Sequence, residues 1–305
     1  MTEPLAPPSS TETWPALPLA EWEPTRATLH MWTQIVGKVR TELSAPVNHW
    51  WHSTLYVTPR GLTTSIIPFG ADSFDIEFDF FDHKVVVRTS RGLTKSVGMY
   101  PRSVADFYRE FMATLKSLGI EVKIWTQPQE VPDAIHFDQD EQHASYDGEY
   151  VRRLHRILMS CDEVFKQFRG RFLGKCSPVH FFWGGFDLAV TRFSGRRAPE
   201  RPNADPVTRE GYSHEVISLG WWAGSGDVKD PAFYAYAAPE PPGFTTARVR
   251  PTTATYHTGL KLYLLMYEDV RKSSDPRRSI LSLAQTTYEA GSTMGGWPTD
   301  LERLG

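Results

Sequence analysis

The chain contains few cysteines, no long apolar stretch and no leader-like start. Cys161 and Cys176 are the only cysteines among 305 residues, too few for a disulfide framework, and this favours a reducing compartment. No segment approaches the roughly 20 apolar residues that a transmembrane helix needs. Glu3 and several prolines stand where a signal peptide would have a basic start and an apolar middle. We therefore expect a cytoplasmic protein that does not enter the membrane.

A basic excess and the common catalytic signatures are also missing. The chain has 33 Lys and Arg against 36 Asp and Glu, a net charge of −3. Proteins that bind nucleic acid or anionic membranes usually carry a positive excess, so we expect neither as a partner. There is no HExxH motif, no paired-cysteine motif, no GxSxG elbow and no glycine-rich nucleotide fingerprint. Covalent catalysis is therefore not indicated.

Aromatic residues, in contrast, are abundant. The chain has 10 Trp, 12 Tyr and 17 Phe, and such residues fill cores and line ligand pockets. In the second half, strand alternation should send some aromatics to the core and others to the opposite face, where they would form a pocket wall. This group consists of Tyr212, Trp221, Trp222, Phe233, Tyr234 and Tyr236.

The two halves of the chain resemble one another in the order of short motifs. In each closing helix a serine stands first, apolar residues follow at helical spacing, and a glycine ends the segment. The corresponding segments are residues 46–51 and 178–182, 73–76 and 213–216, and 103–107 and 279–283. We therefore interpret residues 28–119 and 154–295 as two copies of one unit, each with a helix, four strands and a helix.

The predicted fold class is α+β. Two duplicated halves would pack antiparallel sheets against helices in a pseudo-twofold arrangement around a shared core. The chain then divides into a flexible tail (1–18), a first repeat (19–125), a linker (126–148) and a second repeat (149–297). Periodicity predicts helices at residues 23–43, from 103, at 149–169 and from 279, and strands at 50–58, 62–67, 74–80, 84–89, 120–125, 179–193 with a break at Gly184-Gly185, 214–222, 232–237 and 260–267.

One predicted strand carries a row of carboxylates. Asp75, Glu77 and Asp79 alternate with apolar residues in the strand at 74–80. Alternate residues of a strand point to opposite faces, so the carboxylates share one side. We interpret this acidic row as a solvated sheet face.

Five segments together are similar to a bacterial family catalogued only as a domain of unknown function. They are residues 14–18 (WPALP), 37–40 (GKVR), 48–52 (NHWWH), 143–146 (HASY) and 177–184 (SPVHFFWG). The resemblance extends over nearly the whole chain after the tail. It implies a bacterial origin and supplies no reaction, cofactor or catalytic residue, so the chemistry has to come from the residues of this chain.

Histidines and carboxylates near the starts of predicted strands are candidate metal ligands. His49, His180, His214 and Glu215 belong to this set, and His49 falls opposite His180 in the proposed duplication. Imidazole and carboxylate bind Zn, Fe or Mn, and two histidines with one carboxylate leave positions open for water or substrate. Because His214 and Glu215 are adjacent, a regular strand would point them to opposite faces. The alternative is that these histidines are buried and hydrogen-bonded without a metal.

A metal-free site is a further alternative. His180 or His214 beside Asp187 or Glu215 could form a general acid/base pair, in which the carboxylate orients the ring. Structural ion pairs are the commoner role of such carboxylates. All four residues therefore remain candidate catalytic residues.

Two arginines and two aromatic residues are candidate ligand-binding residues. Arg60 and Arg192 stand at comparable strand-to-turn positions in the two halves. A guanidinium can hold a carboxylate or phosphate through two hydrogen bonds, although arginines in turns are usually surface residues. Trp183 and Tyr212 would line the pocket beside them.

Together these residues predict a cytoplasmic enzyme that acts on a small molecule. Its His/carboxylate site would lie in a cleft, mostly in the second half, and would support chemistry of the hydrolase or oxygenase type with or without a divalent metal. The first alternative is a non-catalytic protein that binds an anionic or aromatic ligand. The second is an interaction module whose aromatic surface meets a partner. The substrate, the reaction and the oligomeric state stay open.

Overall fold

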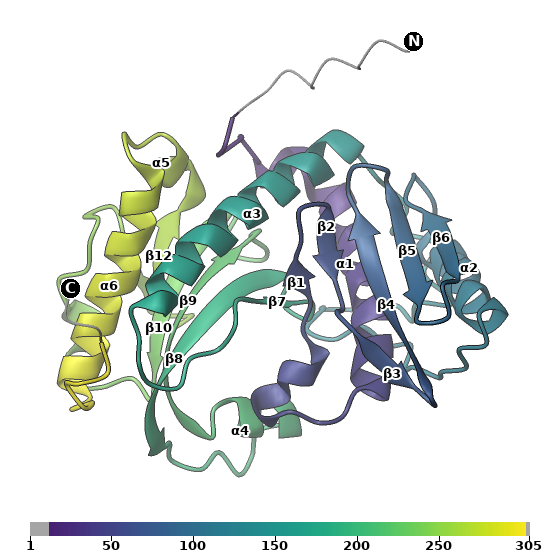
Figure 1. The fold of residues 1–305 in the computed structure, drawn as a ribbon. Helices are drawn as coiled ribbons and strands as arrows, with labels where there is room; N and C mark the ends of the chain where they lie inside the picture. The colour runs from purple at the N-terminus through teal and green to yellow at the C-terminus, as the bar shows by residue number, and fades with distance from the viewer. Residues whose placement is uncertain (1–11, 303–305) are drawn as a thin grey trace, which may run out of the picture.

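Two antiparallel sheets stand beside one another, with long helices packed against both (Figure 1). The structure is a computed structural model and describes residues 12–302. Its helices are α1 (Leu19–Leu43), α2 (Val104–Ser117), α3 (Gly148–Gly170), α4 (Pro206–Gly211), α5 (Tyr267–Arg271) and α6 (Pro276–Met294), with 3₁₀ helices η1 (Asn48–Ser53) and η2 (Phe244–Thr246). Its strands are β1 (Tyr56–Val57), β2 (Gly61–Thr63), β3 (Ile67–Phe69), β4 (Asp72–Asp79), β5 (Lys84–Thr89), β6 (Thr94–Gly98), β7 (His180–Phe182), β8 (Asp187–Arg197), β9 (His214–Trp222), β10 (Ala232–Ala238), β11 (Thr255–His257) and β12 (Leu262–Met266).

The two sheets meet at their edges. The first has the strand order β1-β2-β4-β5-β6, with β3 beside β4, and the second has the order β11-β12-β10-β9-β8-β7. Leu55 and Phe181 exchange two backbone hydrogen bonds of 2.9 Å each between them. The segment that leads into the first sheet therefore lies beside the first strand of the second sheet.

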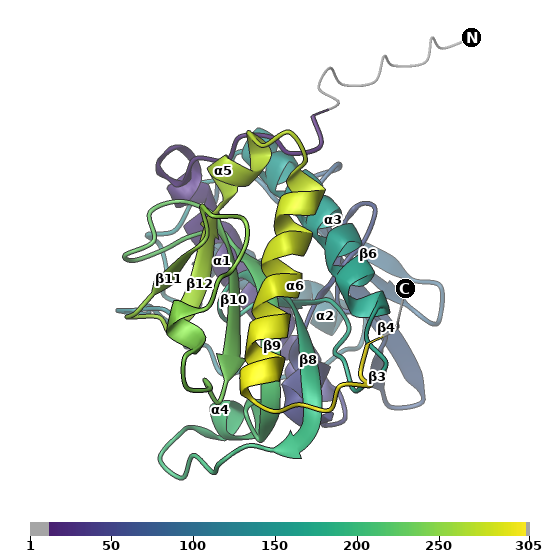
Figure 2. The ribbon, with the colours of Figure 1, turned by 90° about the vertical axis from the view of Figure 1, so that its left-hand side faces the viewer.

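Helices α3 and α6 cover one face of the second sheet (Figure 2). Strand alternation sends Val190, Leu219 and Phe233 towards them into the core. Helix α6 approaches closely because Gly291 has no side chain, since a Cβ there would lie 2.9 Å from Ile217 Cδ1. Within residues 12–302, the long helices that pack on this sheet, α3 and α6, lie on that one face.

Helix α1 is buried along most of its length, and several polar side chains are buried with it, among them those of His30, Gln34 and Lys38. His30, Gln34 and Lys38 follow one another at intervals of four residues, so they lie on one side of the helix. We call these three residues the polar stripe. A buried polar group without a hydrogen-bond partner costs about 1–3 kcal/mol, and the partners of the polar stripe determine how the candidate site is built.

The predicted α+β class with antiparallel sheets is confirmed. The strand predicted at 214–222 coincides with β9, and the predicted break at Gly184-Gly185 separates β7 from β8. Each sheet contains six strands rather than four, because β3, β6 and β11 are too short or too polar to give a clear alternation. The pseudo-twofold duplication stays a prediction.

Two predictions for the first half are wrong. Residues 48–53 form η1 instead of a strand, with His49 and Trp50 both in the left-handed region at φ 60°. Residues 120–125 form no strand. Within the predicted tail, Trp14 is buried and its ring packs against Phe233 and Tyr267, so this part of the tail is ordered. Residues 1–11 of the predicted tail lie outside the described residues.

Two of the three carboxylates in the acidic row are buried, and Asp75 is half-buried. Glu77 is 8% exposed and Asp79 is 3% exposed. Arg88 donates to Asp75 at 2.9 Å and to Glu77 at 2.5 Å, and Arg60 donates to Asp79 at 2.7 Å. Burial is possible because each carboxylate has a guanidinium partner.

Both cysteines are free thiols. Burial raises the pKa of Cys161 well above its ordinary value and that of Cys176 to about 11, so neither is activated as a nucleophile. Among residues 12–302, no helix has both the length and the apolar character needed to cross a membrane.

Candidate functional site

The face of the second sheet opposite α3 and α6 carries tyrosines over small residues. The strand register places Gly220 beside Tyr234 and Ser218 beside Tyr236. The Tyr234 ring lies over Gly220, where any side chain would collide with it, and it stacks on Tyr236 at 6.1 Å between ring centroids. We call this surface the tyrosine face. It comprises the side chains on this side of β7, β8, β9 and β10, with Asp187 at one end and His214 at the other.

Two carboxyl groups meet at one end of the tyrosine face. The Tyr234 hydroxyl donates a 2.5 Å hydrogen bond to Asp187 Oδ2. A Cβ at Gly185 would lie 2.8 Å from Asp187 Oδ1 and 3.5 Å from Glu130 Oε2, so a single methyl group there would contact both carboxyls. At Gly184 a Cβ would lie 2.5 Å from Glu130 Oε1. The two glycines therefore make room for the pair. We call this group, Asp187, Glu130 and Tyr234, the acidic end.

The polar stripe of α1 holds the two loops that form the acidic end. Gln34 donates to the carbonyl of Gln129 at 2.8 Å and accepts from its N–H at 2.7 Å. Lys38 donates to the carbonyl of Gln127 at 2.7 Å. The same helix therefore fastens the loop that carries Glu130, one residue beyond Gln129.

His30 fastens the second loop. Its Nε2 lies 3.0 Å from the carbonyl oxygen of Trp183 and 2.8 Å from that of Gly184. Burial lowers the pKa of His30 to about 4, so the ring is neutral and donates its single N–H to these carbonyls. Since both loops attach to neighbouring turns of one rigid helix, Glu130 is held over Gly184-Gly185.

The backbone at the acidic end is strained. Glu130 has φ 55° and Phe186 has φ 56°, in the left-handed region that costs a non-glycine residue about 1–2 kcal/mol. Such strain persists only where the surrounding contacts impose it, and it gathers at functional sites. Here it turns the Glu130 side chain towards the start of β8.

The electrostatics of the acidic end favour protonated carboxyls. Desolvation and, to a smaller extent, the Glu130 carboxylate raise the pKa of Asp187 to about 7, although the Tyr234 hydrogen bond opposes this shift. Desolvation and the Asp205 carboxylate raise the pKa of Glu130. Glu130 is nevertheless exposed and Asp187 is half-buried, so both can be reached from solvent. A carboxyl with a pKa near neutrality, such as that of Asp187, is suited to general acid/base chemistry.

The predicted metal ligands do not assemble. His49 and His214 lie close, with ring centroids 5.6 Å apart. His180 lies deeper, where burial lowers its pKa to about 3 and its Nδ1 lies 2.8 Å from the Thr54 hydroxyl. Glu215 points to the other side of β9, as strand geometry predicts, and accepts from Ser194 and Arg196. No group of three or more His, Cys, Asp or Glu side chains is arranged to hold a metal anywhere in residues 12–302.

The predicted ligand-binding residues separate in the same way. Tyr212 reaches the tyrosine face, where its hydroxyl lies 3.1 Å from that of Tyr236. Trp183 donates to the carbonyl of Ser53 at 2.6 Å and so braces the loop instead of lining the face. Arg60 and Arg192 both lie away from the tyrosine face.

Arg192 is fully buried, with its guanidinium 3.6 Å from the Phe168 ring centroid and 2.8 Å from Glu302. It therefore anchors the C-terminal segment from inside the core. Arg60 belongs to the first sheet, where it pairs with Asp79. Neither guanidinium is placed at the candidate site.

A comparison with family profiles classifies the chain. The profile of a family of unknown function, DUF5996, matches residues 14–303. The chain belongs to this family. No curated protein and no solved structure matches it. The family resemblance noted from the sequence is thus confirmed, and the DUF5996 chain has to be interpreted from its own geometry.

Two residues of the candidate site were not predicted from the sequence. Glu130 lies in what was interpreted as a linker, and Tyr234 was one of six aromatics without an assigned role. For Tyr234 the sequence contained a usable pattern: it follows the buried Phe233 in β10, so strand alternation places the two side chains on opposite faces of the sheet. Asp187 was among the candidate catalytic residues, and its neighbours in the structure come from distant segments.

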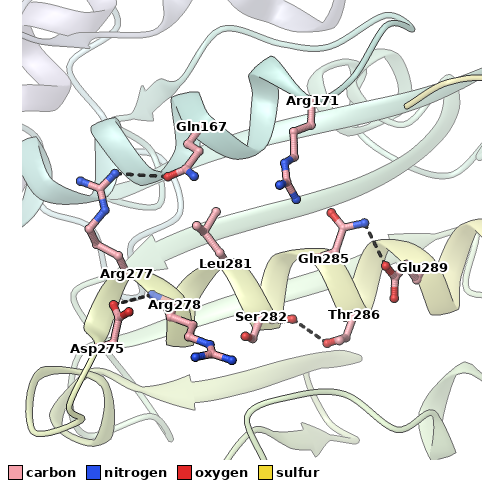
Figure 3. Close-up of a pocket in the computed structure, with 10 residues that line it drawn as sticks. All are labelled: Gln167, Arg171, Asp275, Arg277, Arg278, Leu281, Ser282, Gln285, Thr286 and Glu289. Carbon is pink, nitrogen blue, oxygen red and sulfur yellow. Dashed lines mark hydrogen bonds between the residues drawn. The ribbon is translucent and has the colours of Figure 1, made fainter. Parts of the chain in front are cut away.

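Open hollows in the DUF5996 surface lie away from this chemistry. The larger, of about 550 Å³, lies between α3 and α6 on the far side of the second sheet (Figure 3). Its side chains include Gln167, which accepts from Arg277, and Gln285, which donates to Glu289. A smaller hollow of about 280 Å³ lies beside Glu215 at the end of β9. Size alone therefore does not locate the candidate site.

Proposed function

We propose that the protein is a cytoplasmic, bacterial enzyme that hydrolyses a small molecule by general acid/base chemistry at the acidic end of the tyrosine face. One observation carries the proposal: two solvent-reachable carboxyls, Asp187 and Glu130, share a desolvated, strained site with a tyrosine hydroxyl. A carboxyl whose pKa is raised by burial can act as a general acid, and a second carboxyl beside it can act as the base.

The roles follow from the two environments. Asp187 has a pKa of about 7, so near neutral pH it carries a proton for part of the time and can donate it to a leaving group. Tyr234 occupies Oδ2, which leaves Oδ1, on the Glu130 side, to hold that proton. Glu130 is the more exposed of the two and serves as the base that takes a proton from an attacking water. Transfer of that proton from Glu130 to Asp187 after product release restores the starting state.

The neighbouring surface supports binding of an organic substrate. Gly184 and Gly185 allow a substrate to approach the backbone closely, and Tyr234 and Tyr236 present a stacked aromatic pair. No step requires a metal, because the four expected ligands are split between two sides of β9 and a buried edge.

The test is a hydrolysis assay on a panel of nitrophenyl esters, amides and glycosides. Asp187→Asn and Glu130→Gln are each expected to lose about 10²- to 10⁴-fold in rate, since each removes one proton-transfer group. Asp75→Asn, which removes a carboxylate paired with Arg88 on the first sheet, is the matched control and should keep the activity. Full activity in both site variants, or an Asp187 that titrates at its ordinary value, would contradict the proposal.

A non-catalytic ligand-binding protein is the second candidate. The observation in its favour is the chain of tyrosines, in which Tyr212 bonds to Tyr236 and Tyr236 stacks on Tyr234. In that case an aromatic ligand should bind equally well to wild type and to the Asp187→Asn and Glu130→Gln variants, and should be recovered unchanged.

A further inference from the structure

Cation-forming side chains gather at the other end of the tyrosine face. Lys175 Nζ lies 2.7 Å from His49 Nε2, and the His49 ring lies 5.6 Å from the His214 ring, centroid to centroid. In the register of β8 and β9, Arg197 lies opposite His214. These residues come from η1, from the segment before β7 and from the ends of β8 and β9. We call Lys175, His49 and His214 the basic cluster.

The basic cluster has no counter-charge. None of its three members forms an ion pair with a carboxylate among the described residues. Burial, then Lys175 and His214, lower the pKa of His49, and burial, then Lys175 and Arg197, lower that of His214. Burial lowers the pKa of Lys175 as well. Positive groups thus repel one another where a bound anion would be stabilised.

The nearest carboxylate does not neutralise the cluster. Glu210 Oε1 accepts from the backbone N–H of His49 at 3.1 Å, so it acts on the backbone of η1. The Glu210 carbonyl oxygen lies 3.1 Å from His49 Nδ1. The imidazole therefore carries its proton on Nδ1 and leaves Nε2 as an acceptor for Lys175.

Donors remain free for a ligand. An ammonium has three N–H donors, and His49 uses one of those of Lys175. The Phe193 and Trp51 ring centroids lie 4.8 Å and 5.4 Å from Nζ, so they hold the ammonium by cation–π contact without taking a donor. His214 Nδ1 lies 3.0 Å from the Ser213 hydroxyl, which leaves its Nε2 unused. Lys175 is exposed and can be reached by a solute.

The backbone is strained to build this arrangement. His49 and Trp50 are consecutive non-glycine residues at φ 60°, at a cost of about 1–2 kcal/mol each. This conformation turns the His49 ring onto Phe193, 4.8 Å away between centroids, and so under Lys175. Strain of this kind at a polar cluster is a mark of function.

We propose that the basic cluster is a binding site for a small oxyanion, and that it prefers a phosphate dianion to a monoanionic carboxylate. Lys175 donates to the anion from one side, and His214, as it gains a proton, donates from the other. The site goes beyond the proposed hydrolase: Asp187 and Phe193 lie about 20 Å apart along β8 at about 3.3 Å per residue, so a small anion here does not contact the acidic end.

The test is a titration of the whole protein with inorganic phosphate, followed through the imidazole C2 proton signals by NMR. We expect a saturable shift of the His214 signal and a rise in the pKa of His214, because the anion stabilises the imidazolium. Affinity should weaken about tenfold or more in Lys175→Met, and binding should also weaken as sodium chloride is added. Acetate should bind more weakly than phosphate.

The controls separate the basic cluster from general charge effects. Lys123→Met removes one exposed lysine outside the cluster and should bind phosphate like wild type. His214→Gln provides a second variant should Lys175→Met fail to fold, and it too should bind more weakly. Unchanged affinity in these cluster variants, absence of saturation in wild type, or equal affinity for acetate would overturn the proposal. Asp187→Asn should leave phosphate binding intact. The experiment therefore tests the oxyanion site independently of the hydrolase proposal.

Discussion

The two sheets use charged side chains in opposite ways. On the first sheet, the buried carboxylates of Glu77 and Asp79 are matched with Arg88 and Arg60 at 2.5 Å and 2.7 Å. The second sheet has matched pairs on its helix-covered side, but on the tyrosine face like charges are placed together: carboxyls at the acidic end, and Lys175 with two histidines at the basic cluster. Matched charges stabilise a fold, whereas unmatched charges of one sign are maintained at a cost to stability. The contrast points to the second sheet as the functional one.

The contrast between the sheets predicts its largest effect on stability for a substitution of Asp79. Although burial raises its pKa, the hydrogen bonds from Arg60 and from the N–H groups of Asp82 and Phe81 lower it overall. Because the folded-state pKa is depressed, this carboxylate stabilises the fold above its ordinary pKa. We expect Asp79→Asn to lower the free energy of unfolding by about 3 kcal/mol at pH 8. Urea denaturation would measure it, and the loss should shrink below about pH 4.

At Asp187 we expect the corresponding substitution to raise the free energy of unfolding instead of lowering it. Its folded-state pKa is raised to about 7 from 3.8, so the folded state binds the proton more tightly and stability falls as pH rises from about 4 to 7. Asp187→Asn removes that penalty. Allowing for its partial solvent exposure, we expect a gain of about 2 kcal/mol at pH 8 and none at pH 3.5. A loss of stability at pH 8 would break the comparison between the sheets.

A smaller effect is expected within the acidic end. Glu130→Gln removes the like charge beside Asp187, so the pKa of Asp187 should fall by about one unit, equivalent to about 1.4 kcal/mol. Carbon-13 NMR of the aspartate carboxyls would follow the titration. Glu77→Gln, a change on the first sheet, serves as the control and should leave Asp187 unmoved.

The periodic parts of the fold could be predicted from the sequence. Alternation located β9 to the residue, and it placed His214 and Glu215 on opposite faces of the strand. The predicted break at Gly184-Gly185 also separates β7 from β8. These successes share a cause: strand geometry is local and repeats every two residues.

The failures concern contacts that no local pattern encodes. Residues 48–52 are rich in aromatics, as strands are, yet His49 and Trp50 take left-handed conformations imposed by Glu210, Lys175 and Phe193. Glu130 lies in a polar segment whose position depends on Gln34. A single sequence offers no measure of such long-range pairing, so the metal-ligand prediction joined residues that the fold keeps apart.

The polar stripe of α1 also has a consequence for the order in which parts of the protein fold. Its bonds join Gln34 to Gln129, 95 residues along the chain, and His30 to Gly184, 154 residues along. As the ribosome releases the chain, Gln34 cannot reach its partner until residue 129 has emerged, and His30 cannot reach its partner until residue 184 has emerged. Closing such long loops is slow, so the acidic end should be completed late in folding, and a chain interrupted before residue 184 should have a first sheet but no site.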